Sequence, residues 1–110
     1  MQSVIETSIF TRRADALLTQ SERVELISRL AYDPDQGTVI PGTGGIRKLR
    51  FAAGGQGKRD AFRVVYYVMT QDLPILALLI YGKNEQANPS VDQRRAMMAI
   101  VEAMKAASRR

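Results

Sequence analysis

Arginine, lysine and tyrosine dominate the part of this chain that is best suited to chemistry. The segment GGIRKLRFAAGGQGKRDAFRVVYY, residues 44–67, places Lys48, Arg50 and Arg63 within two apolar runs. The chain has no histidine and no cysteine, so a catalytic site would have to use Lys, Arg, Tyr, Asp or Glu. Zinc sites built on histidine or thiolate ligands and histidine-dependent triads are therefore excluded.

Cleavage of an RNA phosphodiester is a reaction that such residues could perform. It requires removal of the 2′-OH proton, stabilisation of a pentavalent phosphate and protonation of the leaving 5′ oxygen. A guanidinium can hold phosphate oxygens through paired hydrogen bonds, and a lysine or tyrosine can transfer a proton when neighbouring cations lower its pKa. The same groups could instead only bind nucleic acid, with tyrosines stacking on bases. We expect no metal ion and no other cofactor.

Positive charge is concentrated in the middle third of the chain. The net charge is +5 over 110 residues, and residues 45–83 hold seven basic and two acidic side chains, whereas the remainder holds nine of each. Such a concentrated field favours a polyanion, most often nucleic acid, or an acidic protein segment. The alternative is a globular domain whose charges merely fall in this region.

Hydrophobic periodicity predicts a single α+β domain over residues 1–110. Apolar spacing predicts a helix over 7–18, and a capping box from Thr19 to Glu22 predicts a second helix to about residue 32. After a loop, the period changes to two, and Ser90 to Gln93 forms another capping box that opens a C-terminal helix. We therefore expect an N-terminal helical hairpin packed on a three- to four-stranded antiparallel sheet, plus the C-terminal helix. The predicted loop is 33–45, and the predicted strands are 46–53, 62–69 and 75–82, with a short further strand at 2–5.

Alternation along these strands places the cationic side chains on one face of the sheet. The other face is apolar and suited to covering by helices; on the last strand we assign Leu76, Leu78 and Ile80 to it. Symmetric turns would place Arg63 opposite Tyr81. The same assumption places Lys48 opposite Tyr67. A solvated outer face is the alternative, but this face carries no acidic residue on any of its three strands. Its members are Lys48, Arg50, Arg63, Tyr81 and Lys83.

Four motifs occur in this region: G-x-R-K-x-R-F at 45–51, the G-K at 57–58 before the second strand, R-V-x-Y-Y at 63–67 and L-L-x-Y-x-K at 78–83. Together they resemble the RelE/ParE superfamily of bacterial type II toxins, and within it the HigB-like branch, over about residues 1–95. That branch often has two glycines just before the R-V strand, where this chain has Asp60-Ala61-Phe62.

The resemblance implies the toxin component of a type II toxin–antitoxin system with a RelE-like fold. It implies a cytoplasmic, metal-independent endoribonuclease that cleaves mRNA on the ribosome and thereby inhibits translation. The expected partners are the ribosome, mRNA and a cognate antitoxin, expected to be a small helix-turn-helix protein, in a complex able to bind its own operator DNA. No membrane contact is expected, because no apolar run reaches 18 residues.

Residue roles follow from the same resemblance, position by position. Arg63 matches the transition-state arginine of the R-V strand, and Lys48 and Arg50 match basic residues of the preceding strand. Tyr81 and Lys83 match the end of the last strand. The expected catalytic residues are Arg63, Lys48, Arg50, Tyr81 and Lys83, and the expected RNA-binding residues are Arg47, Lys58, Arg59 and Tyr67.

Two other functions fit the same sequence. One is a ParE-like toxin that inhibits DNA gyrase without cleaving RNA, and the other is a non-catalytic module that binds nucleic acid and an antitoxin. The number of cations on one face favours the nuclease, because a toxin that blocks a protein needs no phosphate clamp. Fold alone does not decide among them.

Overall fold

The computed structural model describes residues 2–52, 61–70 and 72–108, which form three helices and five strands. Lys58 and Arg59, two of the predicted RNA-binding residues, lie outside these ranges. The elements in chain order are β1 (Val4–Glu6), α1 (Ser8–Leu17), α2 (Gln20–Tyr32), β2 (Thr38–Val39), β3 (Arg47–Phe51), β4 (Phe62–Tyr67), β5 (Ile75–Gly82) and α3 (Val91–Ser108).

The five strands form one mixed sheet in the order β1-β5-β4-β3-β2. The predicted α+β class, helical hairpin and C-terminal helix are confirmed, but the sheet has five strands, and β1 pairs with β5 in parallel. The strand β2 lies within the segment 33–45 that was predicted to be a loop. Strands of two or three residues are too short to show a period of two, so their pairing depends on the neighbouring strand.

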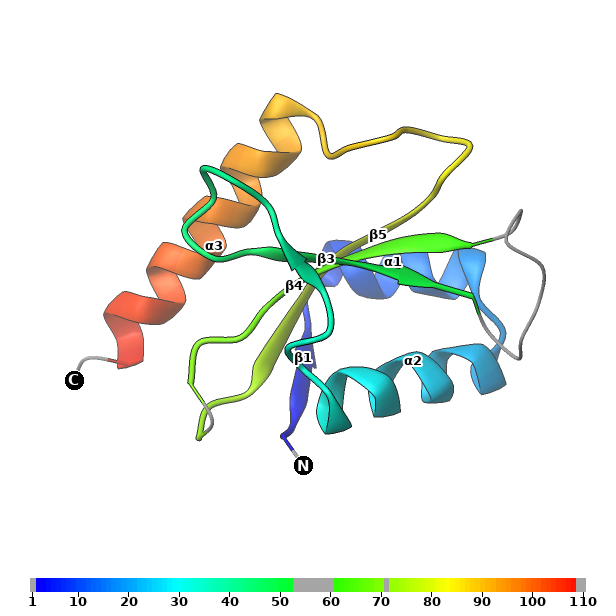
Figure 1. Cartoon of the computed structure of the whole chain (residues 1–110), viewed down its shortest axis with the longest axis horizontal. Helices are drawn as coiled ribbons and strands as arrows, with labels where there is room; N and C mark the ends of the chain where they lie inside the picture. Colours follow the sequence, from blue (N-terminus) through cyan, green and yellow to red (C-terminus); the bar gives the residue numbers. More distant parts are fainter. Residues whose placement is uncertain (1, 53–60, 71, 109–110) are drawn as a thin grey trace.

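The helical hairpin α1–α2 covers one face of the sheet (Figure 1). Thr7 caps α1, because its hydroxyl accepts a hydrogen bond from the backbone N–H of Phe10, and the predicted capping box of Thr19 and Glu22 opens α2. The apolar stripes of both helices meet the sheet in a common core with Leu49, Phe51, Val64, Tyr66, Ile75, Ala77 and Ile80.

Helix α3 packs on the opposite face, so the sheet lies between two helical layers (Figure 1). The predicted capping box at Ser90 and Gln93 is present, with reciprocal hydrogen bonds of 3.1 and 2.9 Å between each side chain and the other residue's backbone N–H. Met97 and Val101 are buried against the strands. No helix within the described ranges is both long and apolar enough to cross a membrane.

A β-bulge in β5 changes which side chains face which layer. Val65 pairs with Leu79 and Tyr66 with Ala77, so the register passes over Leu78. Two consecutive residues of the bulged strand then project to the same side. The assignment of Leu76 and Leu78 to the face that carries Ile80 was therefore wrong. Both side chains pack with α3, whereas Ile80 packs with α1 and α2.

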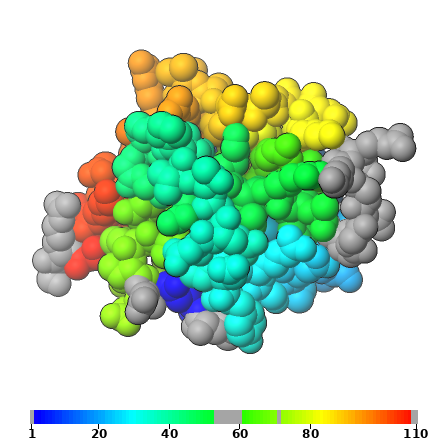
Figure 2. Space-filling model, viewed as in Figure 1, coloured from blue at the N-terminus to red at the C-terminus, as the bar shows by residue number. Residues whose placement is uncertain are grey.

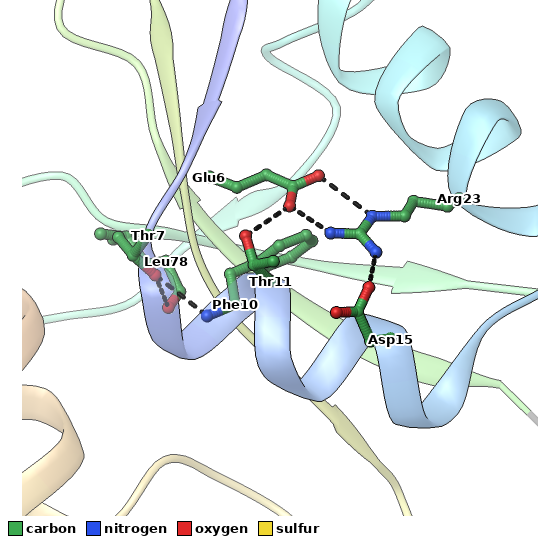
Figure 3. A network of polar contacts seen from close by, with 7 residues as sticks. All are labelled: Glu6, Thr7, Phe10, Thr11, Asp15, Arg23 and Leu78. Atoms are coloured by element: carbon green, nitrogen blue, oxygen red, sulfur yellow. Dashed lines mark hydrogen bonds and ion pairs between the residues drawn. The ribbon is translucent and has the colours of Figure 1, made fainter. Parts of the chain in front are cut away.

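An arginine in α2 joins β1, α1 and α2 (Figure 3). Nη2 of Arg23 donates to Oε1 of Glu6 at 2.5 Å and Nε donates to Oε2 at 3.2 Å, and the guanidinium also pairs with Asp15. The hydroxyl of Thr11 donates to the same carboxylate at 2.7 Å. The hydrogen bonds from Arg23 lower the pKa of Glu6 below its ordinary value, against the opposing effect of burial.

Replacing Glu6 with glutamine should lower the free energy of unfolding at pH 7 by about 1–2 kcal/mol, because charge-assisted hydrogen bonds to Arg23 are lost. A carboxylate with a lowered pKa stabilises the fold above the pKa of the unfolded chain, and this contribution disappears as the pH falls through the folded value. The deficit of Glu6→Gln should therefore shrink in acid, as measured by urea unfolding from pH 7 to pH 3.

The matched control is Glu102→Gln, which removes an exposed carboxylate that pairs with Lys105 three residues away. We expect this substitution to lower the free energy of unfolding by less than about 0.5 kcal/mol. Equal effects of the two substitutions at pH 7 would show that the contact between Glu6 and Arg23 does not stabilise the fold.

Candidate functional site

Three strands bring three cationic side chains and a tyrosine together on the face that α3 also covers. Arg50 on β3 is the direct cross-strand partner of Arg63 on β4, and Arg63 is the partner of Tyr81 on β5. Directly opposed residues of paired strands project to the same side of a sheet. The prediction that these side chains share one face, with Arg63 opposite Tyr81, is confirmed by this register.

Lys48 projects to the same face, although its partner differs from the predicted one. It pairs with Val65 instead of Tyr67, because the β3–β4 register is shifted by two residues from a symmetric turn. A shift of two residues preserves the side of the sheet, since side chains alternate with a period of two. We refer to Lys48, Arg50, Arg63 and Tyr81 as the cationic row.

Helix α3 covers only part of this face. Tyr67 lies beneath it and is buried, whereas Arg50 is exposed and Lys48 and Arg63 are partly buried. The connection 83–90, between β5 and α3, crosses the part that the helix leaves uncovered, where Ala87 and Asn88 contact Tyr81 and Lys48. Figure 2 shows this connection, in yellow, lying against the green surface of the strands.

Arg63 has a hydrogen-bond donor without an acceptor. Its Nη1 atom is buried and makes no hydrogen bond within the described part of the chain. A buried donor left unpaired costs about 1–3 kcal/mol, so native proteins retain few such groups and those that remain call for an explanation. Arg63 as a whole is only partly buried, and a phosphate oxygen at its accessible part suits a guanidinium in geometry and charge.

Tyr81 stands beside Arg63 but is not accessible to a substrate. Its side chain is fully buried, and its hydroxyl donates a long hydrogen bond of 3.4 Å to the carbonyl of Ala87. Burial raises the pKa of Tyr81 above its ordinary value, and the nearby positive charge of Arg63 opposes this only in part. The phenol is therefore neutral near pH 7, so Tyr81 can support Arg63 by packing but cannot act as a general base.

Tyr81→Phe should consequently lower any RNA-cleaving activity by no more than about threefold, because the ring is kept and only a weak hydrogen bond is lost. A group that transfers a proton in the reaction would instead contribute about 10²–10⁴-fold. Single-turnover cleavage rates of the two proteins give the comparison, and a loss above 100-fold would contradict the supporting role.

Lys48 and Lys83 occupy different surroundings. The ammonium of Lys48 donates to Oδ1 of Asn88 at 3.0 Å. Lys83 is exposed and lies in the turn that follows β5, one residue beyond the end of the strand. The nearby carboxylate of Glu85 accepts hydrogen bonds from the backbone N–H of Gly82 at 2.8 Å and from Arg13 at 2.5 Å, and these bonds lower its pKa.

Two predicted RNA-binding residues are positioned by other contacts. Arg47 projects to the face opposite Lys48, where Nη1 donates to the carbonyl of Gly37 at 2.7 Å and to that of Asp35 at 3.2 Å. The ring of Tyr67 lies under α3, with the ammonium of Lys105 5.5 Å from its centroid. The structure therefore does not bring Arg47 into the cationic row, and it leaves Tyr67 little surface for stacking on a base.

Asn88 is a site residue that sequence reasoning missed. It lies forty residues from Lys48, and no local pattern in the connection 83–90 marks it. Within the described ranges, no group of three or more Asp and Glu residues is placed to hold a metal ion. A comparison of the chain with models of known protein families finds no match.

Proposed function

We propose that this protein is the toxin of a type II toxin–antitoxin system and cleaves mRNA on the ribosome, thereby inhibiting translation. The observation that carries the proposal is the buried, unpartnered Nη1 of Arg63 within a row of cations that share one face of the sheet. The RelE/ParE-like motifs of the same strands supply the substrate class and the ribosome.

The residue roles follow from the geometry of the cationic row. Arg63 stabilises the pentavalent phosphate through the accessible part of its guanidinium, which also retains a donor without an acceptor among the described residues. Lys48 and Arg50, on the neighbouring strand, bind the flanking phosphate oxygens, and Tyr81 lies beside Arg63 as its cross-strand partner. Lys83 contributes positive charge at the end of β5. Arg47 is left out of this set because it projects to the other face.

The proposed partners are the ribosome, its mRNA and a cognate antitoxin, and the proposed location is the cytoplasm. The antitoxin is expected to be a small helix-turn-helix protein, encoded next to the toxin, and the complex is expected to bind its own operator DNA. The net charge of +5 supports an acidic or polyanionic partner in each case.

Mapping of the 5′ ends of cellular mRNA after brief induction tests the proposal. Growth arrest accompanied by new 5′ ends within translated codons is the expected result, and the purified protein should cleave mRNA only when translating ribosomes are present. Growth arrest with intact transcripts and damaged DNA would overturn it in favour of a ParE-like inhibitor of gyrase. Normal growth with intact transcripts would also overturn it.

A further inference from the structure

The connection 83–90 is fixed to the first turn of α3 by a chain of side-chain hydrogen bonds. Nε2 of Gln86 donates to Oε1 of Gln93 at 2.8 Å and to the backbone carbonyl of Asn88 at 2.8 Å. Gln93 in turn accepts the backbone N–H of Ser90 at 2.9 Å as part of the capping box. The backbone at Asn88 is therefore fixed by Gln86, and through Gln86 and Gln93 it is connected to the first turn of α3.

This connection crosses the cationic row. Ala87 accepts the hydrogen bond from Tyr81 on β5, and Asn88 accepts the hydrogen bond from Lys48 on β3. The strand between them in the sheet is β4, which carries Arg63. Ala87 and Asn88 thus contact the strands on both sides of β4. The Asn88 side chain accepts the hydrogen bond from the ammonium of Lys48.

The chemistry of the acceptor matters as much as its position. A lysine side chain has four rotatable bonds, so an unrestrained ammonium samples many positions and must be ordered when substrate binds. The Oδ1 atom of Asn88 orders it in advance. An amide oxygen carries no net charge, so the positive field of Lys48 remains available to a phosphate, whereas a carboxylate at the same place would neutralise it.

We propose that Asn88 is a positioning residue that holds the Lys48 ammonium beside Arg50 and Arg63 for the RNA phosphate, and that its neutral amide is required for this role. The inference rests on the proposed function, because it assigns Asn88 a part in that reaction. Asn88 acts through Lys48 and does not itself react.

A double-mutant cycle tests whether Asn88 acts through Lys48. Single-turnover cleavage of ribosome-bound mRNA is measured for the wild type, Asn88→Ala, Lys48→Ala and the double variant. Asn88→Ala should lower the rate constant at saturating enzyme by about tenfold, because the ammonium loses its fixed position. In the Lys48→Ala background the same substitution should change the rate by less than about twofold. Independent effects that multiply in the double variant would overturn the proposal.

The charge requirement is tested by Asn88→Asp, which preserves the shape of the side chain. The probe is binding of the full chain to a single-stranded RNA oligonucleotide at several salt concentrations, which does not depend on cleavage. Neutralising one phosphate-binding cation should reduce the slope of log K against log salt by about 0.7. Asn88→Ala should leave the slope unchanged. A slope for Asn88→Asp equal to that of the wild type would overturn the proposal.

Asn84→Asp is the matched control, because it adds the same charge to the same connection at the only other asparagine of the chain. Its cleavage rate should stay within about twofold of the wild-type rate. Its slope of log K against log salt should stay within about 0.2 of the wild-type slope. Changes as large as those of Asn88→Asp would assign the effect to the general charge of the connection and contradict the proposal. Absence of cleavage by the wild type would refute the proposed function instead, and the two failures are therefore distinguishable.

Discussion

Arg63→Met should abolish RNA cleavage, with a loss of at least about 100-fold, and should leave the protein at least as stable as the wild type. The loss of rate is expected because preorganised donors aimed at a developing negative charge contribute strongly to catalysis. Arg63 is the residue of the cationic row whose guanidinium retains a buried donor without an acceptor in the described structure. Methionine keeps an unbranched apolar stem in place of the arginine stem while removing every donor.

The unchanged or improved stability has a separate physical reason. Arg63 faces Arg50 directly across the β3–β4 ladder, and like charges at opposed positions repel. Its unpaired Nη1 adds a desolvation cost. Removing the guanidinium removes both the repulsion from Arg50 and the desolvation cost. The free energy of unfolding should therefore stay the same or rise by about 1 kcal/mol. Loss of function together with gain of stability is typical of residues retained for binding or catalysis.

Arg95→Met is the matched control for net charge, since Arg95 is an exposed arginine on α3. It should retain cleavage within about threefold. Single-turnover assays compare the cleavage rates of the two variants, and urea titration compares their free energies of unfolding. Cleavage by Arg63→Met at the wild-type rate would remove Arg63 from the mechanism. A strong loss of stability would assign the residue a structural role.

Gly37→Ala should destabilise the fold by about 3 kcal/mol, the largest effect on stability that we expect from a single methyl group. A Cβ at Gly37 would lie 2.6 Å from the hydroxyl oxygen of Tyr66, whose side chain is fully buried. That hydroxyl accepts the N–H of Gly37 at 2.8 Å and donates to the carbonyl of Pro34 at 2.7 Å. The ring cannot move without breaking both bonds.

A double-mutant cycle with Tyr66→Phe identifies the cause. Removing the hydroxyl takes away the closest atom, so Gly37→Ala should cost at least about 1 kcal/mol less in the Tyr66→Phe background. Gly82→Ala is the control, because its Cβ would meet no atom closer than 3.5 Å, and it should change stability by less than about 0.5 kcal/mol. Additive effects of Gly37→Ala and Tyr66→Phe would show that the hydroxyl is not the source of the strain.

Register shows where prediction from the sequence succeeded and where it failed. The pairing of Arg63 with Tyr81 was predicted correctly, because this pair lies between the bulge and the C-terminal end of β5. From Leu76 to Leu78 the predicted faces of β5 were inverted, since the bulge inserts one unpaired position. Nothing in the run of apolar residues in β5 distinguishes the bulged position, because all of its neighbours are equally suited to burial.

The sequence by itself determined the helix starts at Thr19 and Ser90, the α+β class and the common face of Lys48, Arg50 and Arg63. These features depend on hydrogen bonds or alternation within a few residues, so short stretches of sequence specify them. Only the tertiary structure decided the parallel pairing of the edge strand β1 and the partial covering of the sheet by α3. It also decided the hydrogen bonds of Arg47 to backbone carbonyls and the contact of Asn88 with Lys48. Each of these joins segments ten to about seventy residues apart, and such contacts are set by how whole elements pack together.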